Sequence, residues 1–195
     1  EHAQRNILPA LIRVPNINLT GMYTRNSSVL SSVSKQYACS KYTTYLELLE
    51  DPTVDAVYIN SPNSEHFSQI KSCLLKNKHV IVEKIAVISL EEAQVIYDIA
   101  TERRLIVLEA FMFGFHKQFL KLRELIQSNK YGEIREFHAS FGFPELPETN
   151  IRYSKVLSGG ALNDAGAYTV SSVIKLLGDK YKCNYSTLRS LPKYA

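Results

Sequence analysis

The sequence predicts an α/β protein built on a parallel sheet. Four short runs rich in Val, Ile or Leu recur in the first part of the chain, and amphipathic helical patterns lie between them. Dense apolar runs are typical of strands that are covered on both faces, and strands that alternate with helices form βαβ units. The expected strands span residues 17–23, 55–60, 79–84 and 105–110.

Helical patterns fill the intervals between these runs. Thr44 followed by Glu47, and Ser89 followed by Glu92, have the spacing of capping boxes that begin helices. A third helix is expected over residues 63–77, where apolar side chains recur on one face. The order of strands and helices therefore supports βαβ units throughout this part of the chain.

The pattern changes after Ala110. Residues 115–133 predict a longer amphipathic helix, and residues 136–143 alternate strictly between apolar and polar side chains. Strict alternation predicts a strand with one exposed face. We therefore expect a first domain over residues 1–114 and the start of a second, incomplete one over residues 115–195.

The beginning of the sequence lacks one expected element. A Rossmann-type nucleotide-binding sheet begins with a strand that runs into a glycine-rich turn. Residues 1–15 have the pattern of the helix that follows such a turn, and the sequence contains no GxGxxG. Because a sheet without that strand would lack a central element, we expect the strand and its turn to precede Glu1.

Composition argues against several functional classes. Charged residues make up 22% of the chain and the net charge of +4 is spread along it, which argues against nucleic-acid binding. No apolar run approaches the roughly 18 residues of a membrane span, and no signal peptide opens the sequence. Three widely spaced cysteines without a CxxC indicate reduced thiols in a cytoplasmic protein, and we assign no metal site.

Two segments at strand ends carry residues suited to chemistry. Ser61, Pro62 and Asn63 follow one expected strand and precede a helix, at the edge where parallel sheets bind ligands. Glu83 and Lys84 end the next strand, where a lysine can hold positive charge beside a substrate hydroxyl. Both segments are therefore candidates for a binding site.

A third candidate segment spans residues 158–178. Gly159 and Gly160 permit a close approach of the backbone to another group. Asp164 and Tyr168 are four residues apart and share one helix face, so the carboxylate can orient a phenol that exchanges a proton.

Each segment also has a plainer interpretation. Asn63 or Ser64 can be an ordinary helix cap, and Glu83 can be the ion partner of an exposed Lys84. The third segment can be an ordinary amphipathic helix, and His66 alone fits a helix surface better than a ligand.

In this order and spacing, the three segments resemble the Gfo/Idh/MocA family of sugar and cyclitol oxidoreductases. The resemblance covers nearly the whole chain, through "SPNSEH" (61–66), "VEK" (82–84), "EAFMFGFH" (109–116) and "GGALNDAGAY" (159–168). It implies a Rossmann domain followed by an α/β domain whose open, mainly antiparallel sheet binds substrate and forms homo-oligomers. It also implies hydride transfer between NAD(P) and a carbinol or keto carbon of a sugar or nucleotide-linked sugar.

The resemblance assigns roles to individual residues. Lys84 matches the active-site lysine, Tyr168 the acid–base position, and Asp164 the aspartate of the glycine-rich motif. We expect Lys84 to lower the pKa of Tyr168, because a nearby cation favours the phenolate. The positions that match cofactor-binding residues are Thr24, Arg25, Ser61, Pro62, Asn63, His66 and Glu83.

Thr24 and Arg25 bear on the choice of cofactor. They follow the first expected strand, where the adenine ribose is recognised in the family. A hydroxyl and a guanidinium suit a 2′-phosphate, whereas an acid would favour NAD, so we expect NADP, with NAD as the second choice.

Several positions depart from the family pattern. Ile85 stands at the proline of the EKP motif, Gly114 and Lys117 stand where many relatives carry Arg and Pro, and Ser158 replaces a glycine. Two alternatives therefore stay open beside a sugar reductase. One is a dihydrodiol- or inositol-type dehydrogenase that uses the same residues, and the other is a non-catalytic relative acting as a binding or regulatory subunit.

Overall fold

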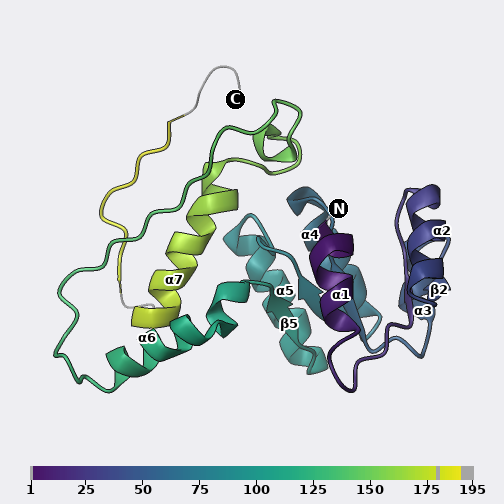
Figure 1. The fold of residues 1–195 in the computed structure, drawn as a ribbon, viewed down its shortest axis with the longest axis horizontal. Coiled ribbons are helices and arrows are strands. Elements are labelled where there is room, and N and C mark those ends of the chain that lie inside the picture. The colour runs from purple at the N-terminus through teal and green to yellow at the C-terminus, as the bar shows by residue number, and fades with distance from the viewer. Residues whose placement is uncertain (1, 179–180, 190–195) are drawn as a thin grey trace. The chain divides into compact units, whose positions relative to one another are not determined.

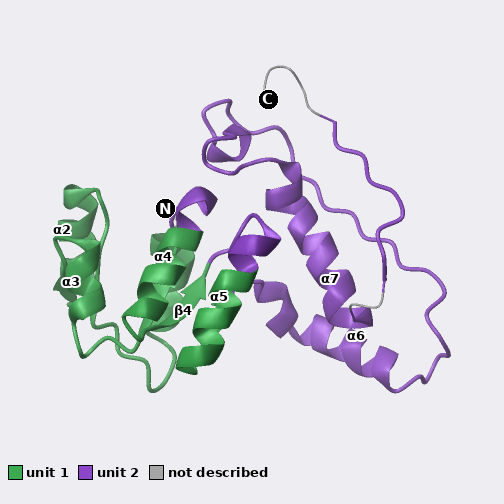
Figure 2. Cartoon of the chain, turned by 180° about the vertical axis from the view of Figure 1, so that it is seen from behind, with its two compact units in different colours: residues 1–60, 67–82, 94–108 green, residues 61–66, 83–93, 109–195 purple. Residues whose placement is uncertain are grey.

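The computed structural model describes residues 2–178 and 181–189, and the end of the predicted second domain lies outside them. The chain divides into two compact units, shown in Figure 2. Unit 1 comprises residues 1–60, 67–82 and 94–108, and unit 2 comprises residues 61–66, 83–93 and 109–195. Each unit is described by itself.

The strands of unit 1 form parallel pairs, as predicted. β1 (Gly21–Met22) pairs in parallel with β2 (Ser40–Lys41). A second sheet has the order β3-β4-β5, with β3 (Ala56–Ile59) parallel to β4 (His79–Val82), and β5 (Val107–Glu109) at its edge. All four expected strands are present in shorter form. β2 was not predicted, because two exposed polar residues carry no apolar signal.

Helices connect these strands in the expected alternation (Figure 1). The capping box of α3 is confirmed, since Thr44 accepts the N–H of Glu47 and the Glu47 carboxylate binds back. Ser89 likewise accepts the N–H of Glu92 before α5, but the Glu92 carboxylate accepts from Ile88. The bounds are η1 Ala3–Ile7, α1 Leu8–Leu11, α2 Ser27–Gln36, α3 Tyr45–Glu50, α4 Asn63–Leu75 and α5 Leu90–Arg103.

The core of unit 1 lies where α4 and β4 contribute their apolar faces. Apolar side chains with 1% exposure or less come from these two elements, at positions that recur with helical and strand periods. They are Ile70, Cys73, Leu74, Val80 and Val82. Burial of this group supplies the main driving force for folding of the unit.

The regular elements that the described part of unit 2 contributes after β5 are all helices, joined by long irregular segments. These helices are η2 (Met112–Phe115), α6 (Lys117–Gln127), η3 (Ile151–Tyr153), η4 (Leu162–Gly166) and α7 (Ala167–Leu177). Across the residues that the structure describes, no helix has the length and apolar character needed to cross a membrane.

Two predictions for this region were wrong. Residues 136–143 form no strand, because no described segment supplies the hydrogen-bonding partner that an extended chain needs. The predicted open antiparallel sheet is accordingly not formed by the described residues. α6 ends at Gln127 and does not reach Gly132, since Asn129 turns into the left-handed region at φ 50°.

Two adjacent leucines of α4 provide a test of the core. Leu74 is fully buried, whereas Leu75 is 48% exposed. Leu74→Ala should lower the free energy of unfolding by about 2–5 kcal/mol, because it removes buried methyl groups and leaves a cavity. Leu75→Ala, the matched control, should change it by about 0.5 kcal/mol, as is usual at the surface. Urea unfolding of both variants measures the difference, and equal losses would contradict the placement of this helix face.

Candidate active site

The structure gathers most of the predicted site residues into unit 2. Because β3 and β4 are parallel, the chain leaves both strands at the same edge of the sheet, and unit 2 includes the segments that follow. The predicted residues in unit 2 are Ser61, Pro62, Asn63, His66, Glu83, Lys84, Asp164 and Tyr168. Thr24 and Arg25 belong to unit 1.

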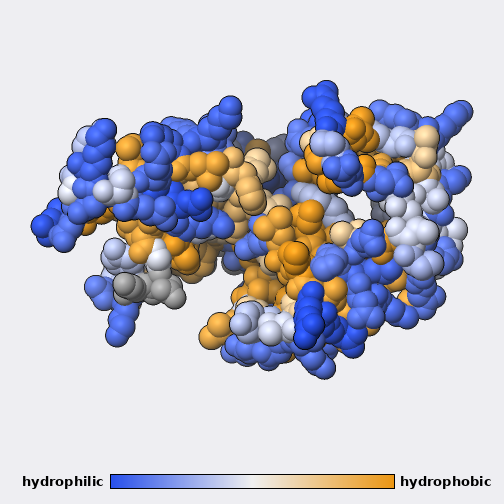
Figure 3. Space-filling view, turned by 90° about the horizontal axis from the view of Figure 1, so that it is seen from below, coloured by the Kyte–Doolittle hydropathy of each residue, from blue (hydrophilic) through white to orange (hydrophobic). Residues whose placement is uncertain are grey.

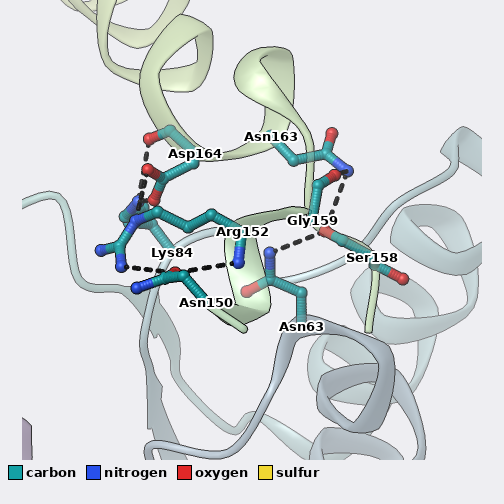
Figure 4. A network of polar contacts seen from close by, with 8 residues as sticks. All are labelled: Asn63, Lys84, Asn150, Arg152, Ser158, Gly159, Asn163 and Asp164. Atoms are coloured by element: carbon teal, nitrogen blue, oxygen red, sulfur yellow. Dashed lines mark hydrogen bonds and ion pairs between the residues drawn. The ribbon is translucent and has the colours of Figure 1, made fainter. Parts of the chain in front are cut away.

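Lys84 and Asp164 form the central ion pair of the site (Figure 4). The Lys84 Nζ donates to Asp164 Oδ1 at 2.5 Å and to the Asp164 backbone oxygen at 2.8 Å. Both side chains are only 13% exposed, so the pair is largely withdrawn from solvent. This lysine and this carboxylate, both predicted site residues, are therefore in direct contact, although they lie 80 residues apart in the sequence.

Arg152 is a second cation on the same carboxylate. Its Nε donates to Asp164 Oδ2 at 2.6 Å, so each carboxylate oxygen has a cationic partner. Asn150 supports the arginine by accepting from its Nη1 at 3.4 Å. Sequence reasoning missed Arg152, because a separation of 12 residues corresponds to no helical or strand neighbour relation that links it to Asp164. The only available signal was that a buried acid needs a partner.

The Ser158–Gly160 turn brings two backbones into close contact. A Cβ on Gly159 would lie 2.5 Å from the Arg152 backbone oxygen, and the N–H of Gly160 donates to that oxygen at 2.7 Å. Gly160 has φ +101°, and Ser158 adopts φ 56° at the position where relatives carry a glycine. The predicted close approach is therefore to the backbone of Arg152.

Two asparagines hold this turn. Asn63 Nδ2 donates to the Ser158 carbonyl at 3.0 Å, and Asn163 Nδ2 donates to the carbonyls of Ser158 and Gly159 at 3.2 and 3.1 Å. Figure 4 shows both amides directed at the turn. Asn63 thus links the start of α4 to the glycine-containing segment, which goes beyond the role of a helix cap.

Tyr168 lies among aromatic rings beside the ion pair. Phe141 stacks on it at a centroid distance of 5.0 Å, and Phe111 and Phe113 approach at 5.5 and 6.0 Å. The Lys84 Nζ lies 5.0 Å from the centroid of the Tyr168 ring. Lysine, carboxylate and phenol therefore meet within one unit.

The expected lowering of the Tyr168 pKa was wrong for this structure. Burial raises the pKa of Tyr168, and the charges of Glu83 and Asp164 raise it further, while Arg152 lowers it. Lys84 cannot reverse this, because Asp164 already pairs with its charge and its ammonium faces the ring. The phenol accordingly keeps its proton to higher pH than an ordinary tyrosine.

The sequence suggested that His66 lies on a helix surface, and this expectation was wrong. His66 is fully buried, and its ring nitrogens lie 2.6 Å from the Ile85 carbonyl oxygen and 2.9 Å from that of Ser61. Carbonyl oxygens only accept, so a neutral ring donates its one N–H to one of the two carbonyls, and the tautomer determines which. These contacts favour a structural role over direct contact with a cofactor.

Thr24 and Arg25 lie between β1 and α2. Thr24 Oγ1 accepts the N–H of Asn26 at 3.4 Å, and Asn26 caps α2 by accepting from Val29. Arg25 is exposed beside this helix start. A guanidinium and a helix N-terminus both favour a negatively charged group.

Comparison with known proteins gives matches along most of the chain. Residues 2–111 match a family model for the oxidoreductase family with an NAD-binding Rossmann fold, and residues 119–193 match the GFO/IDH/MocA C-terminal domain. A dTDP-3,4-didehydro-2,6-dideoxy-alpha-D-glucose 3-reductase from Saccharopolyspora spinosa is 35% identical over 166 residues, which cover 85% of this chain and 50% of that protein.

Two further comparisons extend these matches. A trans-1,2-dihydrobenzene-1,2-diol dehydrogenase from Xenopus tropicalis is 29% identical over 68% of this chain and 40% of its own length. The crystal structure of KijD10, a 3-ketoreductase from Actinomadura kijaniata in complex with NADP and TDP-benzene, has a TM-score of 0.84. It is 34% identical and covers 91% of this chain and 55% of its own. The chain thus spans about half the length of the relatives that it matches.

The protonation of Tyr168 can be tested by titration. A difference titration of phenolate absorbance between the wild type and Tyr168→Phe should assign one phenol that ionises above the ordinary range, because burial dominates its pKa. Arg152→Gln should move that pKa further up, since the arginine lowers it, and Asp164→Asn should move it down.

Arg123→Gln, at an exposed position of α6, is the matched control and should leave the Tyr168 titration in place. A Tyr168 phenol that ionises below the ordinary range would show that Lys84 dominates after all.

Proposed function

This chain belongs to the Gfo/Idh/MocA oxidoreductase family, and on that premise we propose that it is part of a nicotinamide-dependent oxidoreductase. The reaction is hydride transfer between the cofactor and a carbinol or keto carbon of a sugar or nucleotide-linked sugar. The observation that carries this proposal is the Lys84–Asp164 ion pair beside the Tyr168 ring. We assign residues 1–114 to cofactor binding and residues 115–195 to the start of a substrate-binding domain.

Comparison with relatives supports a nucleotide-linked sugar as the substrate class. The Saccharopolyspora spinosa relative is named as a reductase of a dTDP-linked sugar, and KijD10 was crystallised with TDP-benzene. The second candidate is a dihydrodiol-type dehydrogenase, which the Xenopus tropicalis relative favours at lower identity and coverage. A panel of dTDP-sugars and dihydrodiols distinguishes these two substrate classes.

The residues present fit an NADP cofactor. Thr24 and Arg25 would hold a 2′-phosphate beside the start of α2, where the hydroxyl, the guanidinium and the helix N-terminus all suit an anion. The carboxyl ends of β3 and β4 are the place where ligands of parallel sheets bind. Ser61 and Pro62 come shortly after β3, and Glu83 directly follows β4. When bound, the nicotinamide supplies or accepts the hydride. NADP was also bound in the KijD10 structure.

In this proposal, the site residues transfer the proton and stabilise the charge that forms during the reaction. In the direction of reduction, Tyr168 donates its proton to the substrate oxygen as the adjacent carbon receives the hydride. Its raised pKa keeps that proton available at neutral pH. Lys84 would hold positive charge beside the substrate oxygen as that oxygen accepts the proton, and Asp164 holds the ammonium in place. Oxidation uses the same groups in reverse.

We assign the protein to the cytoplasm and expect it to form homo-oligomers through its C-terminal domain, without nucleic-acid or membrane partners. Val170 and Ile174, one turn apart on α7, are 51% and 52% exposed, and Phe141 is 53% exposed. Figure 3 shows hydrophobic residues reaching the surface among hydrophilic ones. Exposed apolar groups of this kind favour a covering partner, and light scattering of the full-length protein tests the oligomer.

The catalytic assignment can be tested in the full-length protein. Lys84→Met and Tyr168→Phe should each lower turnover by about 10²–10⁴-fold, because each removes part of the general acid–base system. NADPH oxidation with the accepted dTDP-sugar measures the loss. The exposed Lys155→Met is the matched control and should keep full turnover. Full turnover in both Lys84→Met and Tyr168→Phe would contradict the roles given to these residues, and a wild type without turnover would support the non-catalytic subunit.

The cofactor assignment rests on Arg25. Arg25→Ala should weaken NADP binding by about 1.5–3 kcal/mol, roughly 10- to 150-fold, because a charge-assisted contact to the 2′-phosphate is lost. NAD lacks that phosphate and should bind almost as before. Titration calorimetry with both cofactors measures the ratio, with Arg13→Ala as an exposed control in the same unit. Equal losses for the two cofactors would contradict NADP specificity.

A further inference from the structure

The segment after Lys84 lacks the proline that the family motif carries there, since Ile85 occupies its place. The next peptide group, between Ile85 and Ala86, is nevertheless bound at both of its polar atoms. His66 Nδ1 lies 2.6 Å from the Ile85 carbonyl oxygen, and Glu109 Oε1 accepts the N–H of Ala86 at 2.8 Å. The peptide group is planar, so binding both atoms restricts its orientation.

His66, the partner of the Ile85 carbonyl, is itself held in place by its surroundings. His66 is fully buried in the first turns of α4, and its Nε2 lies 2.9 Å from the Ser61 carbonyl oxygen. One imidazole thus spans the segments that follow β3 and β4. A ring in this position resists rotation, because rotation breaks the hydrogen bond that its N–H makes to a backbone carbonyl.

The carboxylate side comes from the end of β5. Glu109 is partly buried, and burial raises its pKa, while the Ala86 N–H and the charges of Lys175 and His66 lower it. Burying a carboxylate is costly unless it is paired or hydrogen-bonded. The cost of keeping Glu109 here is offset in part by its contact with Ala86. The Ile85–Ala86 peptide follows β4, and its two partners come from the neighbouring strands: His66 from the segment after β3 and Glu109 from the end of β5.

We propose that His66 and Glu109 are positioning residues that orient the Ile85–Ala86 peptide and thereby hold Lys84 against Asp164. Their hydrogen bonds supply the local rigidity that a proline gives the motif in relatives. Lys84 immediately precedes this peptide, so a rotation there moves its backbone away from the place where Nζ meets the carboxylate. The proposal deepens the proposed function, because it concerns the same lysine.

Chemical labelling of Lys84 tests this proposal without any activity measurement. Lys84 is 13% exposed, so acetic anhydride should acetylate it slowly in the wild type. Glu109→Ala should raise its labelling rate roughly 5- to 150-fold, the range expected when one buried hydrogen bond is lost. Glu109→Gln keeps an acceptor oxygen and should label within about threefold of the wild type. Peptide mass spectrometry reads each lysine separately.

Lys78 is the internal folding control, because it is 7% exposed and donates to two backbone carbonyls of unit 1. If Lys78 labels fast in Glu109→Ala, that variant has unfolded, and Glu109→Asp, one methylene shorter, takes its place. Lys84 labelling at the wild-type rate in a folded Ala or Asp variant would overturn the proposal. Labelling in Glu109→Gln as fast as in Glu109→Ala would also overturn it.

Turnover adds a second readout in the full-length protein. Glu109→Ala should lower kcat for the accepted dTDP-sugar by a similar factor and leave KM for NADP nearly unchanged, with kcat largely retained in Glu109→Gln. If Lys84→Met keeps full turnover while Glu109→Ala still exposes Lys84 to labelling, the proposed function fails and the positioning role stands. If Lys84→Met is inactive while Glu109→Ala changes neither labelling nor kcat, the positioning role fails alone.

Discussion

The site depends above all on neutralising the Asp164 carboxylate, which is only 13% exposed. A carboxylate withdrawn from water is stable only when it is paired and hydrogen-bonded. Lys84 binds one of its oxygens and Arg152 the other, from segments remote in sequence. The Gly159–Gly160 turn must therefore approach the Arg152 backbone closely, because the same short segment carries both the arginine and the turn's hydrogen-bond acceptor.

The charge balance around Tyr168 explains its chemistry. Two cations, Lys84 and Arg152, pair with Asp164 beside Tyr168, but the ring itself lies among Phe111, Phe113 and Phe141. Burial, together with the charges of Glu83 and Asp164, penalises the phenolate more than Arg152 favours it. A tyrosine in this state carries its proton at neutral pH and is a weaker acid than an ordinary tyrosine. In the proposed reaction, the lysine places its charge beside the substrate oxygen.

Parallel strand ends explain why the site forms at all. The parallel strands β3 and β4 end at the same edge of the sheet, and β5 is the neighbour of β4. His66 follows β3 and Glu109 ends β5, and both contact the Ile85–Ala86 peptide, which follows β4 directly after Lys84. Residues that lie far apart in the sequence are thus brought together, because the sheet topology determines where each strand ends.

The sequence alone determined the strand–helix alternation and the α3 capping box, because period and capping chemistry are local signals. The direct pairing of Lys84 with Asp164 was decided by the tertiary structure. The sequence could not place Arg152, whose link to Asp164 depends on a turn with positive φ. It predicted a strand at residues 136–143, although pairing requires a partner that only tertiary structure can supply. It also gave the wrong direction for the Tyr168 pKa, because burial among three rings outweighs one cation and is decided by packing.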